Sequence, residues 1–174
     1  MIRTAAIFAL LGSAATAEQY YLPEALEIAK GAPAVIEVLT NANAECVDGN
    51  AGELVIFDDR AIVATDLDGD LGRDDSGQMD DWVVDLNYAS CTLGTLWAGS
   101  GGAPISFIRD GSESAAWTGG SWELIRFNEY LPVVILIGRH GGACDSYGAA
   151  PCVQAVTVSD EGFLTVLFPE QNDR

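Results

Sequence analysis

Aspartates are concentrated in one segment of this 174-residue chain, and carboxylates so close together are suited to holding a metal ion. Asp66, Asp68 and Asp70 stand at alternate positions, and the further acids Asp74 and Asp81 follow them. In a tight turn, alternate carboxylates face inward, and calcium is a hard cation that takes about six to eight oxygen ligands. So many like charges would destabilise an empty loop. We therefore expect a structural calcium ion bound by Asp66, Asp68 and Asp70, with either Asp74 or Asp81 completing the site.

This aspartate loop matches an EF-hand loop only in part. Counted from Asp66, the sixth residue is Leu71, where an EF-hand has Gly, and the twelfth is Gly77, where it has a bidentate Glu. Strands are expected on both sides of the loop, over residues 61–65 and 82–86, where an EF-hand has helices. The alternative to an ion site is a solvated acidic turn that binds nothing tightly.

The context of the loop resembles the calcium loop of FG-GAP or VCBS-type β repeats. In both, a strand is followed by Asp-x-Asp-Gly-Asp, then by an acidic pair, here Asp80 and Asp81, and then by an apolar strand. The loop of those repeats is more compact, so residues 71–77 look like an insertion of about seven residues. The resemblance implies a calcium loop between two strands, and the insertion leaves the fourth carboxylate open between Asp74 and Asp81.

Most of the chain also resembles a group of small exported proteobacterial proteins without an assigned activity. These share a helix ending in Cys, an aspartate loop, a strand ending in Cys, a Gly-rich segment and a C-terminal Pro-Cys; here the cysteines are Cys46, Cys91 and Cys152. Their Gly-rich segment is Cys-Gly-x-Gly-Gly-Cys, whereas this chain has Ala98 and Ala103 at the two ends. The resemblance implies that this chain has one disulfide fewer than those proteins.

The chain has four cysteines, an even number that predicts disulfides in an exported protein. Several pairings are possible. We favour Cys46 with Cys91, and Cys144 with Cys152, because the second pair closes a short loop rich in Gly and Ala that bends freely. Zinc is not expected, since His140 is the single histidine and the cysteines lack ligand spacing.

Residues 1–17 have the pattern of a secretory signal peptide, with a positive Arg3 and an apolar run over residues 5–11. The run is well short of the roughly 20 residues that a membrane-spanning helix needs. We therefore expect cleavage before Glu18, one globular domain over residues 18–174, and a location in the periplasm or outside the cell. No later segment is expected to insert into a membrane.

The charge of the chain restricts its partners. It has 26 acidic and 8 basic residues, for a formal net charge of −18 at pH 7. Such a surface repels nucleic acid and anionic lipid, so we expect neither as a partner. It suits a bound cation, a basic protein partner, or high solubility alone.

The pattern of apolar residues predicts an α+β fold, with an N-terminal helix packed on a mainly antiparallel β-sheet of about seven or eight short strands. A helix is expected over residues 33–46 and a shorter one over residues 23–30. Beyond the two strands that flank the aspartate loop, the expected strands are residues 53–57, 105–108, 122–127, 133–137, 153–158 and 163–168.

These features favour a non-enzymatic, calcium-stabilised binding or interaction module. One alternative is a small secreted hydrolase in which His140 acts with an aspartate as general base. Another is a carbohydrate- or peptide-binding module whose ligand stacks on Trp117 and Trp122, which lie on either side of a Gly-Gly pair.

Overall fold

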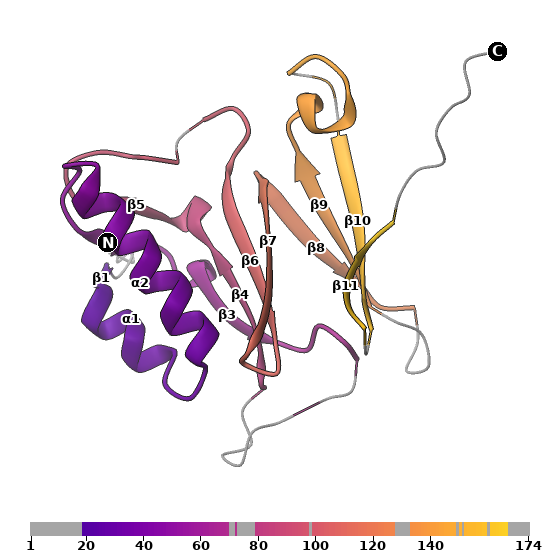
Figure 1. Cartoon of the computed structure of the whole chain (residues 1–174), viewed down its shortest axis with the longest axis horizontal. Helices are drawn as coiled ribbons and strands as arrows, with labels where there is room; N and C mark the ends of the chain where they lie inside the picture. Colours follow the sequence, from indigo (N-terminus) through magenta and orange to yellow (C-terminus); the bar gives the residue numbers. More distant parts are fainter. Residues whose placement is uncertain are drawn as a thin grey trace, which may run out of the picture.

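The computed structural model describes residues 19–69, 72, 79–97, 99–127, 133–148, 150, 152–159 and 161–166. In this part of the chain, two helices precede most of the strands (Figure 1): α1 (Leu22–Ile28) and α2 (Pro33–Asp48). A proline stands in the first turn of each helix, where a missing N–H costs nothing. Val35, Leu39, Ala42 and Cys46 are buried on one side of α2, at the spacing of a single helical face.

Every paired strand runs antiparallel to its neighbours, and the strands form three sheets. The small sheet has the order β1 (Tyr20–Tyr21), β2 (Leu54–Ile56), β5 (Ala89–Cys91). The central sheet has the order β3 (Ile62–Thr65), β4 (Asp81–Asp85), β6 (Ala103–Arg109), β7 (Glu113–Gly119). The C-terminal sheet has the order β11 (Gly162–Thr165), β10 (Cys152–Ser159), β9 (Val134–Arg139), β8 (Ser121–Ile125). Short 3-10 helices are η1 (Asp59–Ala61), η2 (Leu86–Tyr88) and η3 (Gly141–Cys144).

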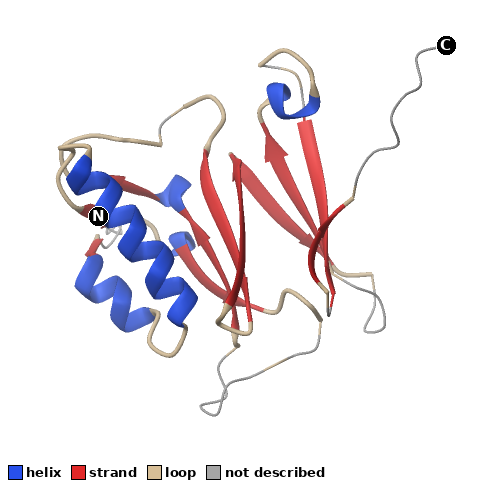
Figure 2. Cartoon of the chain, in the orientation of Figure 1, coloured by secondary structure: helices blue, strands red, loops and turns tan. Residues whose placement is uncertain are grey.

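The central sheet is covered on both faces, with the helices on one side and the C-terminal sheet on the other (Figure 2). Successive residues of a strand point to opposite faces. Trp82 and Val84 of β4 belong to the core that includes the helices, whereas Val83 belongs to the core between the two sheets. Phe107 of β6 lies at the centre of this second core and is fully buried.

The prediction of one N-terminal helix on a single sheet of seven or eight strands is therefore wrong. The described residues form three sheets, and the helices cover only one face of the central one. The change of sheet occurs at Gly120, the single residue between β7 and β8. A Cβ at Gly119 would lie 2.8 Å from Ile137 Cγ2, so the corner packs tightly against β9. The Gly119-Gly120 pair indicates a turn in the sequence, but it does not indicate that the next strand joins a different sheet.

Arginines join the two sheets of the C-terminal half, and each donates to a main-chain oxygen across the interface. Arg109 of β6 donates to the carbonyl of Ser159 in β10. Arg139 of β9 donates from Nε to the carbonyl of Thr118 in β7, at 3.1 Å. Arg126, just after β8, donates to the carbonyl of Asp66, just after β3. The sandwich is thus held by charged donors as well as by apolar packing.

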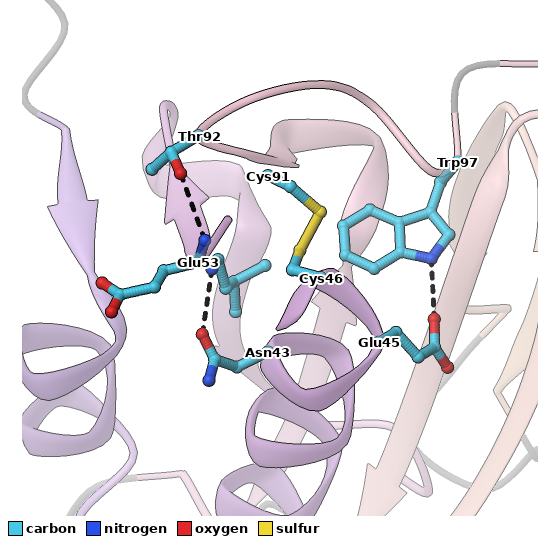
Figure 3. Close-up of a disulfide and its surroundings, with 8 residues drawn as sticks. Asn43, Glu45, Cys46, Glu53, Cys91, Thr92 and Trp97 are labelled. Atoms are coloured by element: carbon cyan, nitrogen blue, oxygen red, sulfur yellow. Dashed lines mark hydrogen bonds between the residues drawn. A yellow bond between two sulfur atoms is a disulfide. The ribbon is translucent and has the colours of Figure 1, made fainter. Parts of the chain in front are cut away.

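Two disulfides fix other parts of the fold. Cys46, near the end of α2, is bonded to Cys91 of β5 (Figure 3). Cys144 of η3 is bonded to Cys152 of β10. This is the pairing that the sequence favoured. None of the helices in the described residues is long and apolar enough to cross a membrane.

Candidate metal centre

The register of β3 and β4 brings the two ends of the aspartate loop together. Thr65 of β3 pairs with Asp81, the first residue of β4, so Asp66 follows directly beside Asp81. One carboxylate oxygen from each of Asp66, Asp68 and Asp81 lies within 4.8 Å of the other two. Three residues that the sequence proposed as ligands therefore converge at one point. Asp70 and Asp74 lie outside the described residues, so of the two open choices for the further ligand, Asp81 is the one placed at the cluster.

Asp81 is held in position by main-chain donors. Its carboxylate is 1% exposed, and it accepts hydrogen bonds from Leu67 N at 2.6 Å and from Asp110 N at 2.8 Å. Burial raises the pKa of Asp81 above its usual value of 3.8, because water is removed from the charged form. The two hydrogen bonds oppose this rise in pKa, whereas the nearby charges of Asp80 and Asp110 add to it. A cation beside Asp81 would relieve the cost of keeping it ionised.

Asp66 is also buried, and it already has a cationic partner. Its Oδ1 accepts from Gly69 N at 2.7 Å, and its Oδ2 accepts from Arg126 Nη1 at 2.8 Å. The Arg126 side chain is 41% exposed, whereas that of Asp66 is 4% exposed. Arg126 therefore neutralises part of the cluster from the C-terminal sheet.

Sequence reasoning missed Arg126, although a usable signal was present. This residue lies inside the expected strand over residues 122–127, whose other members are mostly apolar. The chain has only eight Lys and Arg residues against 26 acids, and this excess of acids predicts an acidic partner for an arginine in such a strand.

A second acidic group shares Asp81 with the first. Asp80, Asp81 and Asp110 each offer an oxygen within 4.8 Å of the others, but Asp110 is exposed and Asp80 is half-buried. Both groups consist only of carboxylates, which suit hard cations rather than zinc or copper. The cluster of Asp66, Asp68 and Asp81 could hold a metal ion, and the donor set alone does not fix which one.

The residues of the alternative functions lie elsewhere. His140 precedes η3, and its Nδ1 accepts a hydrogen bond from Gly142 N. No carboxylate oxygen of the described residues lies within 4.0 Å of its ring nitrogens. Trp117 and Trp122 are half-buried, and both contact Phe107, with ring centroids 6.0 and 5.9 Å apart. Packing between the two sheets therefore accounts for these tryptophans, and no observation favours a hydrolase or a stacking platform on them.

Comparison with protein-family models, with curated proteins and with solved structures finds no match for this chain. The resemblance to FG-GAP or VCBS-type loops thus stays a prediction that rests on the loop residues. The function has to be argued from the geometry of the chain itself.

Proposed function

We propose that this chain is an exported, disulfide-bonded protein in which a calcium ion bound by Asp66, Asp68 and Asp81 fastens the loop after β3 to the start of β4. The observation that carries the proposal is the convergence of three carboxylates, two of them buried, at the end of the β3–β4 pair. Buried carboxylates are costly unless they are paired or coordinate a metal. The Arg126 guanidinium pairs with Asp66, whereas Asp81 accepts hydrogen bonds from the main-chain N–H groups of Leu67 and Asp110.

Calcium fits this donor set better than the other common metals. All of the converging groups are carboxylates, and calcium accepts such oxygens in flexible geometry, with main-chain carbonyls and waters filling the remaining positions. Zinc prefers nitrogen and sulfur ligands, and magnesium demands nearly ideal octahedral geometry.

The role of the ion is structural, and the chain acts as a non-enzymatic binding or interaction module. An ion held by Asp66 and Asp81 would link two residues that flank a long loop in the sequence. It would then restrict the loop in the folded state and strengthen the β3–β4 pairing. A structural ion of this kind needs no open coordination position for a substrate.

The location in the periplasm or outside the cell rests on two observations. The N-terminal 17 residues have the pattern of a secretory signal. Two disulfides with all four cysteines paired are typical of oxidising compartments. Calcium sites of low affinity, with Kd of about 10⁻⁴–10⁻³ M, are also typical of extracellular modules.

Calorimetry on residues 18–174, freed of metal by chelation, tests the ion claim. Calcium at about 100 times Kd should raise Tm by about 5–10 °C, and the same concentration of magnesium should raise it less. Asp68→Asn should weaken calcium binding at least tenfold, because it removes one charged ligand. Asp48→Asn, at the exposed end of α2, is the matched control and should bind as the native chain does.

Two results would contradict the proposal. One is a Tm and a titration heat that do not respond to calcium in the chelated protein. The other is a calcium response that is the same in Asp68→Asn and in Asp48→Asn, which would place the ion elsewhere.

A further inference from the structure

A cavity of about 220 Å³ lies between η2, β5 and the Gly-rich segment that leads into β6. Its walls include the rings of Phe57 and Trp97 and the apolar side chains of Leu86 and Ala89. None of the described residues that line it carries a charge, although the chain as a whole has a formal charge of −18. This uncharged hollow in a strongly acidic protein is separate from the aspartate cluster.

The aromatic wall of the cavity is fixed in place. Trp97 donates from Nε1 to Glu45 Oε2 of α2 at 3.1 Å, and it packs against the core that contains the Cys46–Cys91 disulfide (Figure 3). Phe57 is tied by its main-chain N–H to the carbonyl of Tyr88 in η2. The Trp97 ring is therefore held by a side-chain hydrogen bond, and the main chain that carries Phe57 is held to η2. A preorganised wall lowers the entropic cost of binding.

Asn87 lines the cavity, and its side-chain amide already makes hydrogen bonds within the protein. Asn87 donates from Nδ2 to Asp85 Oδ1 at 2.7 Å and to Gly119 O at 2.8 Å. Its Oδ1 accepts from Ala103 N at 3.0 Å. Both donors of the amide are used, so Thr95 supplies the side-chain hydroxyl for a ligand at the rim. A charged ligand would find no counter-charge in this cavity.

The turn from Gly99 to Gly102 forms one wall of the cavity. Gly102 has φ of +80°, which favours glycine, and a Cβ there would lie 2.1 Å from Gly119 O. The turn is closed by a hydrogen bond from Gly102 N to Gly99 O at 3.0 Å. A side chain at Gly102 would clash with the main chain of β7, so this position of the wall needs glycine.

We propose that this cavity binds a small, uncharged aromatic molecule with one hydrogen-bonding group, of the size of phenol or indole. An apolar cavity of about 150 Å³ is enough to hold benzene in an engineered protein. The volume here accommodates one ring with a substituent or a fused second ring. The two aromatic walls favour a ring over an aliphatic chain of the same size, because rings gain from offset or edge contacts. The proposal does not depend on calcium.

The test is a titration of ¹⁵N-labelled residues 18–174 with indole and with phenol, followed by NMR. The indole N–H of Trp97 and the amides of Gly99 and Gly102 should shift and saturate, with Kd on the order of 0.1 mM for a ligand of this size. Benzylamine, a cation that the acidic chain attracts, and cyclohexanol, which has no aromatic ring, should each bind at least tenfold more weakly.

Two glycine variants provide a matched pair. A Cβ at Gly99 would meet only Gly101 N, at 4.0 Å, and a Cβ at Gly120 would meet nothing within 4 Å, so both positions accept a side chain. Gly99→Leu adds bulk at the cavity and should weaken indole binding at least tenfold. Gly120→Leu, which is not at the cavity, should leave it unchanged.

Several outcomes would overturn the proposal. These are shifts that do not saturate or that centre on residues away from the cavity, equal binding by benzylamine or cyclohexanol, and unchanged indole binding by folded Gly99→Leu. Trp97→Ala gives a second measurement that does not rely on added bulk. It should abolish saturable binding, and retention of binding would equally count against the site.

Discussion

The two faces of the central sheet are held to the rest of the protein by different means. On the helix face, Trp82 and Val84 pack against an apolar core, and the Cys46–Cys91 disulfide ties α2 to the neighbouring small sheet. On the other face, apolar packing is accompanied by arginine hydrogen bonds and buried carboxylates. The helix layer is therefore restrained by a covalent bond to the small sheet, whereas the interface between the central and C-terminal sheets also contains charged groups and is sensitive to pH and ions.

The alternation of β4 explains why the acids gather on the second face. Asp81, Val83 and Asp85 point the same way, toward the C-terminal sheet, and the two carboxylates are each 1% exposed. Asp85 is satisfied across the interface, because its Oδ2 accepts from Trp122 Nε1 of β8 at 3.1 Å. Asp81 is satisfied by main-chain donors at its own end of the sheet. Buried acids thus belong to the sandwich and not to the helix layer.

The largest loss of stability is expected from removing the Cys46–Cys91 disulfide. Cys46 and Cys91 are 45 residues apart, so the loop-entropy relation predicts that Cys46→Ala with Cys91→Ala lowers the free energy of unfolding by about 4 kcal/mol. Cys144 and Cys152 are 8 residues apart, and the same double change there should cost about 2.5 kcal/mol. Urea denaturation of the two double variants measures both values.

The pair of disulfide variants serves as its own control, since each removes two cysteines. If the loss for Cys144 and Cys152 equals or exceeds that for Cys46 and Cys91, the disulfide of the helix layer is not the dominant restraint.

A smaller loss of stability is expected from removing the ion pair between Arg126 and Asp66. Arg126→Gln leaves the buried Asp66 without its cation and should lower the free energy of unfolding by about 2 kcal/mol in chelator. Calcium should recover part of this loss, because it can take the place of the guanidinium charge. Arg139→Gln removes an inter-sheet bond that involves no carboxylate, so its loss should not respond to calcium. Chemical denaturation with and without calcium measures both variants.

Equal recovery by calcium in Arg126→Gln and Arg139→Gln would argue that Arg126 and the ion do not share Asp66.

The smallest effect is expected from the titration of Asp81. Because burial raises its pKa in the folded state, the folded protein binds a proton more readily than the unfolded chain does. The contribution of Asp81 to the free energy of unfolding should therefore fall as the pH rises above 3.8, in chelator. Asp81→Asn should remove this slope, and its effect should be smaller than that of Arg126→Gln. Unfolding measured between about pH 4 and 7 compares the two chains.

Calcium should abolish the slope in the native chain, since a bound cation favours the ionised carboxyl. A slope of opposite sign in chelator would show that hydrogen bonding, and not burial, dominates the pKa of Asp81.

The local features of this protein could be read from its sequence, but their arrangement could not. The expected helix over residues 33–46 is present as α2, because its apolar residues repeat with helical spacing and Pro33 starts it. β7 was missed, since Ala115, Ala116 and their polar neighbours give a weak strand signal. The central and C-terminal sheets meet at the Gly119-Gly120 pair, which marks a turn in the sequence but does not show that the chain passes to another sheet.

The sequence predicted the aspartates of the candidate site but not the arginine that pairs with one of them. Asp66 and Asp68 were proposed from their spacing, and Asp81 was one of two choices that the resemblance to a β-repeat calcium loop left open. The β3–β4 register brings the three together. Arg126 lies just after β8, 60 residues from Asp66 in the chain, and pairing over that distance follows from tertiary packing rather than from any local pattern.

The inter-sheet arginine bonds have a consequence for sequences that diverge from this one. Arg109 and Arg139 donate to main-chain carbonyls, so the residues that accept, Ser159 and Thr118, can be replaced by almost any other without loss of the bond. Selection on these contacts would act on the arginines alone. Methods that infer neighbours from paired substitutions would therefore overlook these two contacts, even though they join the two halves of the sandwich.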